Sequence, residues 1–229
     1  SHTISILIVE DNIELLAVLE EIFSSIYKVY KATDGQQGYN MALKLQPDLV
    51  LSDVMMPVMS GSQLCRLIKS NDDTCHIPVV LLTARTSVDK MLEGLMIGAD
   101  DYITKPFSLA ILRARVNTQL KRNLPPGGAV VLGPFSFDFD SLVYRKNGFL
   151  VELSHTEQKL LKILVENRGH AVARAVLVDR IWTDGAEYVD ENALTVAVKR
   201  LRAKLEDDPS KPVWLKTVYG IGYMWVVGV

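Results

Sequence analysis

The sequence has little cysteine, no long apolar run and almost no net charge. Its 229 residues include two cysteines, which excludes a disulfide-stabilised scaffold and favours a reducing compartment. No apolar stretch approaches the ~20 residues that cross a bilayer, and the apolar residues 4–9 are too few for a signal peptide. We therefore expect a cytoplasmic protein that does not contact the membrane. The net charge of −2 means that any surface for nucleic acid must be local.

The hydrophobic pattern is interrupted once, which favours two domains. A chain of 229 residues exceeds the roughly 100–200 residues that are usual for one domain. Residues 123–129 read NLPPGGA, and neither a helix nor a strand tolerates that combination of proline and glycine. We predict a first domain over residues 1–122, a linker over 123–129 and a second domain over 130–229.

In the first half, short apolar runs alternate with amphipathic stretches, which is the pattern of strand and helix units around a parallel sheet. Runs without polar alternation are typical of strands that are buried on both faces. The strands are expected at residues 4–9, 27–33, 49–51, 77–82 and 102–104, and helices at 13–23 and 61–68. The expected fold class is α/β, with a doubly wound, five-stranded parallel sheet.

Three carboxylates stand where buried strands end. Glu10 and Asp11 follow the first strand, and Asp53 follows the third. Because ligands bind at the carboxyl ends of strands in an open parallel sheet, these side chains should converge. Clustered carboxylates repel one another unless one is protonated or a cation lies among them, and oxygen ligands suit Mg²⁺. Thr83 and Lys105 close later strands and add a hydroxyl and an ammonium group to the same edge. A carboxylate that accepts a phosphoryl group needs this set of groups.

Four ordered motifs resemble the receiver domains of response regulators. They are residues 6–12 (ILIVEDN), 51–57 (LSDVMMP), 82–85 (LTAR) and 98–107 (GADDYITKPF). The resemblance implies a flavodoxin-like fold with Asp53 as phosphoacceptor, and Lys105 in contact with the phosphoryl group through a loop with a cis Lys105-Pro106 bond.

The same resemblance implies a metal site and a conformational switch. The Mg²⁺ ligands would be Glu10, Asp11, Asp53 and the Met55 carbonyl. In that family a threonine hydroxyl is drawn to the phosphoryl oxygens and an aromatic side chain swings inward, and Thr83 and Tyr102 would be that pair. Phosphorylation would then act by shifting the population between two packings.

The receiver branch with OmpR and PhoB pairs through its fourth helix, fifth strand and fifth helix, by charge pairs across a two-fold axis. The charged residues that fit this scheme are Asp100, Asp101, Arg115 and Arg122. Met91, Met96 and Ile111 stand where charged partners are often found, so either the interface is more apolar or the receiver does not pair this way. Residues 76–86 (HIPVVLLTART) look more like receivers of hybrid histidine kinases, and a natural or an engineered domain combination would explain that.

In the second half, residues 135–140 alternate and residues 146–148 (KNG) indicate a hairpin, before three helical patterns and a final hairpin. Helices are expected at residues 155–167, 173–182 and 191–206, with Ser154 and Glu157 forming a capping box for the first. On the third helix, an apolar stripe lies beside a polar stripe of Thr195, Lys199 and Arg202. Arg200 and Lys204 lie further round, within reach of phosphates.

Residues 195–205 (TVAVKRLRAKL) and 215–223 (LKTVYGIGY) resemble the recognition helix and wing of OmpR/PhoB output domains, which are α+β winged helix-turn-helix domains. The resemblance implies base contacts by Thr195, Lys199 and Arg202, and phosphate contacts by Arg200, Lys204 and Thr217. Tyr219 stands at a wing position that is often arginine, which weakens the case for minor-groove readout by the wing. We expect the remaining large aromatic residues, Trp182, Trp214, Tyr223 and Trp225, to pack rather than to stack on bases.

The sequence thus favours a transcriptional response regulator over other classes. A sensor histidine kinase would phosphorylate Asp53, and a homodimer would bind promoter DNA. The loop over residues 183–190 is compatible with contact to RNA polymerase. A phosphatase of the haloacid dehalogenase type would carry Asp-x-Asp after the first strand, which is absent, so no enzyme activity is expected beyond the domain's own phosphorylation and dephosphorylation. An alternative is a constitutive DNA-binding regulator whose receiver is an unphosphorylated interaction module.

Overall fold

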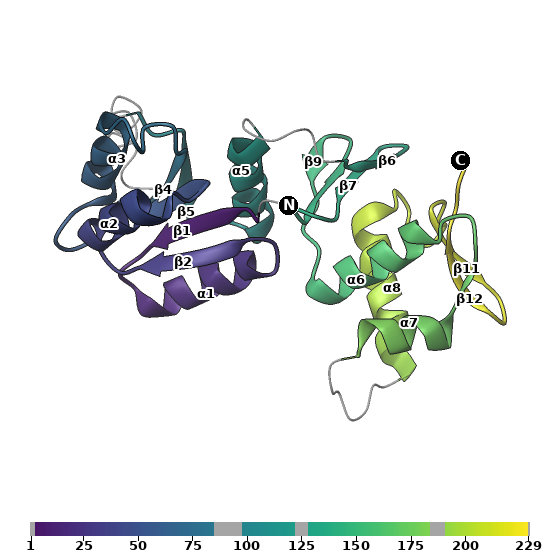
Figure 1. The fold of residues 1–229 in the computed structure, drawn as a ribbon. Coiled ribbons are helices and arrows are strands. Elements are labelled where there is room, and N and C mark those ends of the chain that lie inside the picture. Colours follow the sequence, from purple (N-terminus) through teal and green to yellow (C-terminus); the bar gives the residue numbers. More distant parts are fainter. Residues whose placement is uncertain (1–2, 85–97, 122–127, 184–190, 229) are drawn as a thin grey trace. The chain divides into compact units, whose positions relative to one another are not determined.

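The computed structural model describes residues 3–84, 98–121, 128–183 and 191–228, and the chain divides into two compact units, Ser1–Gly127 and Gly128–Val229. Figure 1 shows the elements of both units. Within the described ranges, no helix is long and apolar enough to cross a membrane. Cys65 is buried and Cys75 is exposed, and both are free thiols.

The first unit is a five-stranded parallel sheet in the order β2-β1-β3-β4-β5 with helices on both faces. The strands are β1 (Ser5–Val9), β2 (Lys28–Ala32), β3 (Leu49–Asp53), β4 (Val79–Ala84) and β5 (Asp101–Lys105). The helices are α1 (Ile13–Ser24), α2 (Gly35–Leu45), α3 (Gly61–Ser70) and α5 (Leu109–Lys121). One apolar cluster joins the sheet to α1 and α5, and a second joins it to α2 and α3. The predicted α/β fold class is confirmed.

Side-chain caps fix where the first three helices begin. Asn12 and Asp34 accept backbone N–H groups at the starts of α1 and α2, and Ser60 forms a capping box with Gln63 at the start of α3. A Cβ at Gly61 would collide with the carbonyl oxygen of Asp53. Glycine therefore allows α3 to begin directly against the end of β3, which places the helix beside the acidic edge.

Most boundaries differ from the sequence prediction by one or two residues, and the sequence pattern gave no range for α2 or α5. β3 continues two residues further than expected and includes Asp53, and β4 begins after Pro78 because proline lacks the N–H that a central strand donates. The sequence pattern gave no prediction for α2, whose first turns contain Gly35 and Gly38. A Cβ at Gly38 would lie too close to the Val9 side chain. Glycine has low helix propensity, but here it lets α2 pack closely on β1.

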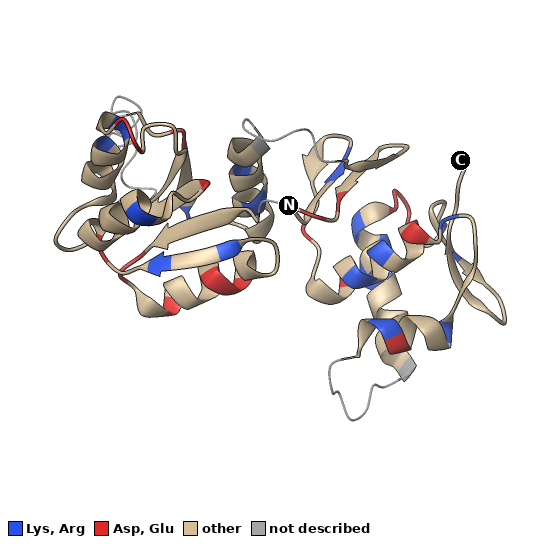
Figure 2. Ribbon diagram, in the orientation of Figure 1, with Lys and Arg blue, Asp and Glu red and all other residues tan. Residues whose placement is uncertain are grey.

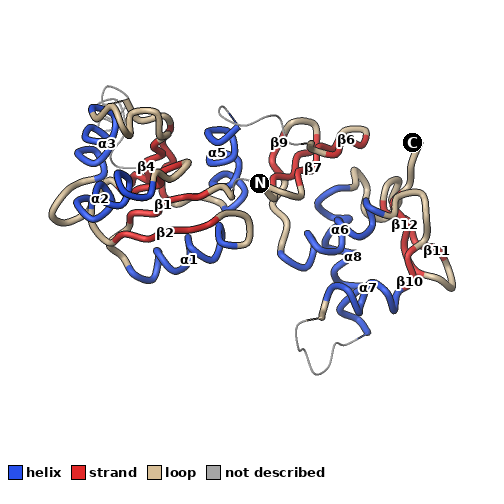
Figure 3. The backbone as a smooth tube through the Cα atoms, viewed as in Figure 1, coloured by secondary structure: helices blue, strands red, loops and turns tan. Residues whose placement is uncertain are grey.

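The second unit combines two small antiparallel sheets with three helices (Figure 3). The first sheet has the order β6-β7-β8-β9, with β6 (Val130–Leu132), β7 (Phe135–Asp138), β8 (Val143–Lys146) and β9 (Phe149–Leu150). The second has the order β10-β12-β11, with β10 (Val172–Ala173), β11 (Leu215–Val218) and β12 (Gly222–Trp225). The helices are α6 (His155–Glu166), α7 (Arg174–Ile181) and α8 (Glu191–Leu205). The predicted hairpin turn is present, with positive φ angles of 52° at Asn147 and 81° at Gly148.

Aromatic side chains fill the core of the second unit. Trp225 is fully buried and packs edge-on against Phe135 and Phe137, while Trp214 stacks on Trp225. Tyr223 is buried, and Trp182 packs against the same cluster. The prediction that these aromatic residues serve packing is confirmed, and α6 and α8 are held to the sheets by this core.

Candidate functional site

The three predicted carboxylates meet at the carboxyl end of the parallel sheet. One carboxylate oxygen from each of Glu10, Asp11 and Asp53 lies within 4.8 Å of the others. The arrangement follows from topology, because β1 and β3 are hydrogen-bonded neighbours and Glu10 and Asp53 are at their ends. Asn12 then caps α1, which turns the chain away immediately after the acidic pair.

Glu10 is the carboxylate that most needs a further partner. Its side chain is 1% exposed, and its Oε2 atom is buried without a hydrogen-bond partner among the described residues. Burial, followed by the hydrogen bond and the negative charge of Asp53, raises the pKa of Glu10 to about 8, although Lys105 opposes the shift. An oxygen-rich cluster with an orphaned buried oxygen fits a hard divalent cation, which would supply the missing partner.

Lys105 completes the polar group around Asp53. Its Nζ atom lies 3.0 Å from Asp53 Oδ2, and it stands at the end of β5 before the cis Lys105-Pro106 bond that the sequence predicts. Asp53 is 7% exposed, so little of it reaches solvent. The Met55 side chain is largely exposed, and the role of its carbonyl as a ligand stays a prediction.

The two predicted switch residues lie on one face of the sheet. Tyr102 pairs in register with Leu81, and Thr83 follows two residues later, so Thr83 and Tyr102 point to the same side. Tyr102 is 7% exposed and lies in the apolar cluster under α2 and α3. Burial beside Cys65 raises the pKa of Tyr102 to about 12, and its hydroxyl has no hydrogen-bond partner among the described residues. The ring is therefore in the inward position.

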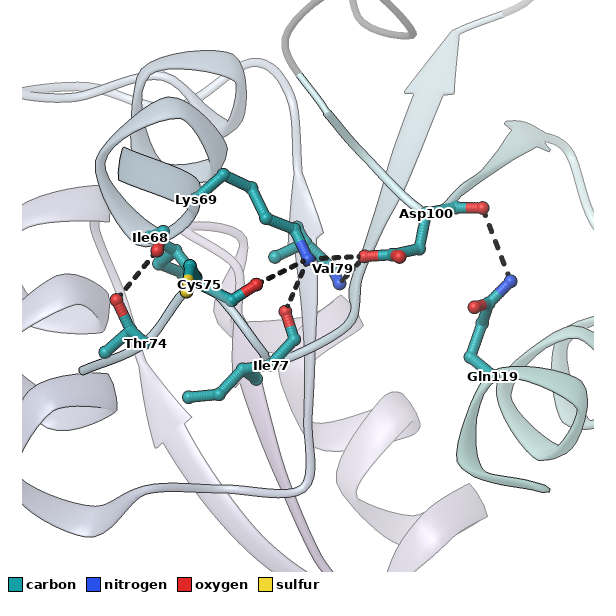
Figure 4. A network of polar contacts seen from close by, with 8 residues as sticks. All are labelled: Ile68, Lys69, Thr74, Cys75, Ile77, Val79, Asp100 and Gln119. Carbon is teal, nitrogen blue, oxygen red and sulfur yellow. Dashed lines mark hydrogen bonds and ion pairs between the residues drawn. The ribbon is translucent and has the colours of Figure 1, made fainter. Parts of the chain in front are cut away.

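Asp100, which the resemblance places in the pairing surface, has several hydrogen-bond partners within the chain (Figure 4). Its Oδ2 atom accepts hydrogen bonds from Lys69 Nζ and from the Val79 backbone N–H, each at 2.8 Å, and Lys69 also donates to the Ile77 carbonyl at 2.8 Å. Gln119 of α5 donates to the Asp100 carbonyl at 3.3 Å. Asp100 thus joins α3, the start of β4 and α5 within one chain, a role that the sequence pattern did not predict.

The remaining predicted pairing residues are partly described. Arg115 donates to both carboxylate oxygens of Asp101, at 2.9 Å and 3.2 Å, and Ile111 is 42% exposed on the same helix as Arg115. Met91, Met96 and Arg122 lie outside the described residues, as does the loop over 184–190. Among the predicted pairing residues that the structure describes, Asp101 and Arg115 thus form an ion pair, and Ile111 is an exposed apolar side chain.

The second unit presents a basic helix. Figure 2 shows lysine and arginine along α8. Lys199 and Arg200 are exposed, and Thr195 is exposed with its hydroxyl accepting a hydrogen bond from Arg174 at 3.1 Å. In the β11–β12 hairpin, Thr217 is exposed and Tyr219 is 91% exposed next to Gly220, whose φ is 79°. A helix and a hairpin that project polar side chains from one core are suited to the grooves of duplex DNA.

Arg202 and Lys204 have partners within the protein. Arg202 donates to the Leu215 carbonyl at 2.9 Å and to the Thr217 hydroxyl at 3.0 Å, and its guanidinium lies over the Tyr223 ring. Lys204 Nζ lies 2.6 Å from Glu157 Oε2, a carboxylate that is 4% exposed. These contacts attach α8 to the hairpin and to α6, which gives both cations a positioning role. Their predicted contacts with DNA stay predictions.

Three further positioning residues were not found from the sequence. Arg174 donates to the Tyr223 hydroxyl at 2.9 Å and to Thr195, and buried Glu206 accepts from the backbone N–H groups of Val213 and Trp214. Lys69 in the first unit is the third. The partners of Arg174 lie in distant segments, and those of Glu206 lie across a loop, so neither set follows from a helix or strand pattern. The capping-box motif identified Glu157, but only its capping role.

Fold and site together define a class of protein: an α/β domain with an acidic site suited to accept a phosphoryl group, joined to a winged helix-turn-helix domain. Residues 6–117 match the family described as response regulator receiver domain, and residues 148–225 match the family described as transcriptional regulatory protein, C terminal. The chain belongs to the OmpR/PhoB family of response regulators.

Individual relatives agree with this assignment. The chain is 36% identical to the probable transcriptional regulator ycf27 of Porphyridium aerugineum, over 96% of this chain and 95% of that protein. It is 39% identical to the sensory transduction protein RegX3 of Mycobacterium bovis, over 96% of this chain and 97% of that protein. A receiver domain of a signal transduction histidine kinase from Syntrophus aciditrophicus is 34% identical, with a TM-score of 0.50, and covers 56% of this chain and 97% of that structure. The receiver is therefore similar both to regulators of the OmpR/PhoB family and to a receiver domain of a histidine kinase.

Proposed function

We propose that a sensor histidine kinase transfers a phosphoryl group to Asp53, and that phosphorylation promotes dimerisation and binding to promoter DNA. The single observation that carries the first step is the convergence of Lys105 Nζ, 3.0 Å away, and the acidic cluster on Asp53. Mg²⁺ is the proposed cation, held by Glu10, Asp11, Asp53 and the Met55 carbonyl. When bound, it would neutralise charge on the phosphoryl oxygens.

In the proposed transfer, an Asp53 carboxylate oxygen forms a bond to phosphorus while the bond from phosphorus to the donor nitrogen or oxygen breaks. Lys105 exchanges its contact with the free carboxylate for one with a phosphoryl oxygen, so its charge stays within the site throughout. The Thr83 hydroxyl, buried near the end of β4, would donate to a second phosphoryl oxygen. The protein thus contributes positioning and charge, and the donor contributes the reactive bond.

The phosphorylated state would favour one of two packings around Tyr102. Phosphorylation acts through its greater affinity for the packing in which Thr83 approaches the phosphoryl group and the aromatic ring is inward. Because Thr83 and Tyr102 share a face of the sheet, movement of one opens space for the other. Inward Tyr102 leaves the α5 surface with Ile111 and Arg115 free to meet a second copy, which would place two DNA-binding units on adjacent half-sites.

For the second unit, we propose that α8 enters the major groove and that the β11–β12 hairpin approaches the neighbouring backbone. Exposed Lys199 and Arg200, with Thr195, would contact the DNA. The combination of a basic helix and an overall net charge of −2 supports this location, because the cations are concentrated where a duplex would lie.

The experiment that tests the proposal measures intact mass and sedimentation after incubation with acetyl phosphate and Mg²⁺. The wild-type protein should gain one phosphoryl group and dimerise, and the isosteric Asp53→Asn variant should do neither while keeping its thermal stability. A wild-type protein that takes up no phosphoryl group would contradict the proposal and favour a constitutive DNA-binding regulator with an unphosphorylated receiver.

A further inference from the structure

The centre of the outward face of α8 is partly apolar. Buried positions on this helix are Leu194, Ala197, Val198, Leu201 and Leu205. At about 100° per residue, the direction opposite to them falls on Val196, Lys199 and Ala203, with Arg200 beside this line. All four of these side chains are exposed. Arg202 lies nearer the core and is half-buried. Of the polar stripe that the sequence suggested, Lys199 is therefore near the centre of this face and Arg202 is at its side.

The side chains at the edges of this face have structural partners. Arg202 donates hydrogen bonds to Leu215 and Thr217. Lys204 forms an ion pair with Glu157, and Thr195 accepts a hydrogen bond from Arg174. These bonds fix the helix relative to α6, α7 and the hairpin. What α8 presents directly outward is therefore a basic pair, Lys199 and Arg200, interleaved with two apolar side chains.

Val196 stands out because its presence there costs helix stability. It is 42% exposed, and of the described side chains of α8 it is the large apolar one that is exposed. A β-branched residue at an exposed helix position has lower helix propensity than alanine, lysine or arginine, and exposure gives it little packing energy in return. A gain in binding free energy, made when Val196 contacts a partner, would account for this residue. Because Lys199 and Arg200 are its neighbours on this face, that partner must combine an apolar group with groups that attract cations.

We propose that Val196 is a specificity-determining residue that contacts the C5 methyl group of a thymine in the major groove. The thymine methyl is the apolar group that base edges display there, and lysine pairs with guanine O6 and N7. Val196 and Lys199 are separated by about 4.5 Å along the helix axis, similar to the spacing of about one base step. The half-site should therefore contain a thymine next to a guanine. The inference rests on the proposed DNA binding and names the base that this helix selects.

The test uses the phosphorylated full-length chain and a pool of random-sequence duplexes. Sequences enriched by the wild-type protein are resynthesised with deoxyuridine in place of thymidine, one position at a time. Uracil keeps the base pair and removes only the C5 methyl group. We expect one position in each half-site where this change weakens binding about fourfold, the effect of one buried methyl group, next to a guanine whose replacement also weakens binding.

Two valine variants assign the methyl contact to a side chain. Val196→Ala should bind thymine and uracil duplexes equally at that position. Val176→Ala is the matched control, because Val176 is a similarly exposed valine on the neighbouring helix α7. It should keep the fourfold preference, which separates a specific contact from a general effect of removing an exposed valine.

The outcomes separate this inference from the function on which it rests. Enriched sequences that tolerate uracil at every position, or a Val196→Ala variant that retains the thymine preference, would overturn the assignment of Val196 and leave DNA binding intact. Failure of the wild-type protein to enrich any sequence would overturn both. A thymine preference that disappears in Val196→Ala and persists in Val176→Ala would establish the contact.

Discussion

Lys105 Nζ lies 3.0 Å from Asp53 Oδ2, and this contact spans two strands that are not neighbours in the sheet, because β4 separates β3 from β5. The lysine therefore reaches across the end of β4. In the strand order, β1, which the acidic pair follows, lies on one side of β3, and β5 lies on the other side. Along this edge of the sheet, Asp53 thus stands between the acidic pair and the ammonium group of Lys105.

Replacement of Lys105 should slow phosphorylation without preventing it. Lys105→Gln removes the fixed charge from the phosphoryl oxygens, and we expect uptake from acetyl phosphate to be slower by on the order of 100-fold. The rate is measured by intact mass over time at saturating Mg²⁺. Lys31→Gln is the control, since the ammonium group of Lys31 is held in an exposed ion pair with Glu20. Equal rates for the two variants would contradict the role of Lys105.

The stability of the receiver should depend on pH through Glu10. The pKa of Glu10 is raised from 4.5 to about 8 in the folded protein, mainly by burial and then by Asp53. Between pH 4.5 and about pH 8 the folded state binds more protons than the unfolded state, so the free energy of unfolding falls as pH rises. Without a divalent cation, we expect the melting temperature to decrease by at least several degrees between about pH 5 and about pH 8.

Added Mg²⁺ should reverse this loss, because the cation binds the ionised carboxylate that high pH produces. Thermal denaturation with and without Mg²⁺ measures both effects. Glu10→Gln removes the titrating group and should flatten the pH dependence, whereas Glu14→Gln, an exposed residue of the first turn of α1, should not. The same slope in Glu10→Gln as in the wild-type protein would exclude Glu10 as its origin.

The sequence pattern brought the carboxylates and Lys105 together correctly, whereas it did not reveal the intramolecular partners of the cations on α8, for a physical reason. Asp53 and Lys105 are placed by the ends of buried strands, and strand ends can be located from apolar runs. The partners of Lys204 and Asp100 depend on tertiary contacts, over 47 residues between Lys204 and Glu157. A helical projection shows which positions face outward, but not which outward cations are bound to another part of the chain. α2 was missed because its glycines are selected by packing and not by propensity.

Asp100 and Ile111 should have separable effects, although the family pattern places both in a pairing surface. Asp100→Asn weakens the hydrogen bonds to Lys69 and to the Val79 N–H, and we expect it to lower stability by about 1–3 kcal/mol, because the substitution removes the charge from a partly buried hydrogen-bond network. Scanning calorimetry measures this change. Phosphorylation of the folded Asp100→Asn variant should still produce dimers.

Ile111→Glu should have the opposite effects: unchanged stability and impaired dimerisation. The side chain is 42% exposed, so the change should leave the melting temperature nearly unaltered. Two negative charges would be brought together if the α5 surfaces meet, and phosphorylated protein should then sediment as a monomer. Val131→Glu, a more exposed valine of β6 in the other unit, is the control. A dimer of unchanged strength in Ile111→Glu would move the proposed interface away from this part of α5.

Lys199, Arg200 and Lys204 should differ in the salt dependence of DNA binding. Lys199→Ala and Arg200→Ala should change how steeply affinity falls with salt, by about one unit of slope for each phosphate that is no longer neutralised, or alter base preference where the side chain binds a base. Lys204→Ala should leave the slope unchanged and lower stability by about 1–3 kcal/mol, because Glu157 is left as a buried, unpaired carboxylate. A reduced slope for Lys204→Ala would instead support the phosphate contact that the sequence predicts for Lys204.

A double variant isolates the structural role of Lys204. In Lys204→Met with Glu157→Gln, neither charge is present, and the new amide oxygen could still accept the backbone N–H of Ser154 that Glu157 binds at 2.9 Å in the capping box. Removing both charges avoids the cost of a buried unpaired ion, so the double variant should be more stable than Lys204→Met alone. Its affinity for random duplexes and its salt slope should match those of the wild-type protein. Additive losses in stability, measured by denaturant titration of all four proteins, would show that the two residues do not act as a pair.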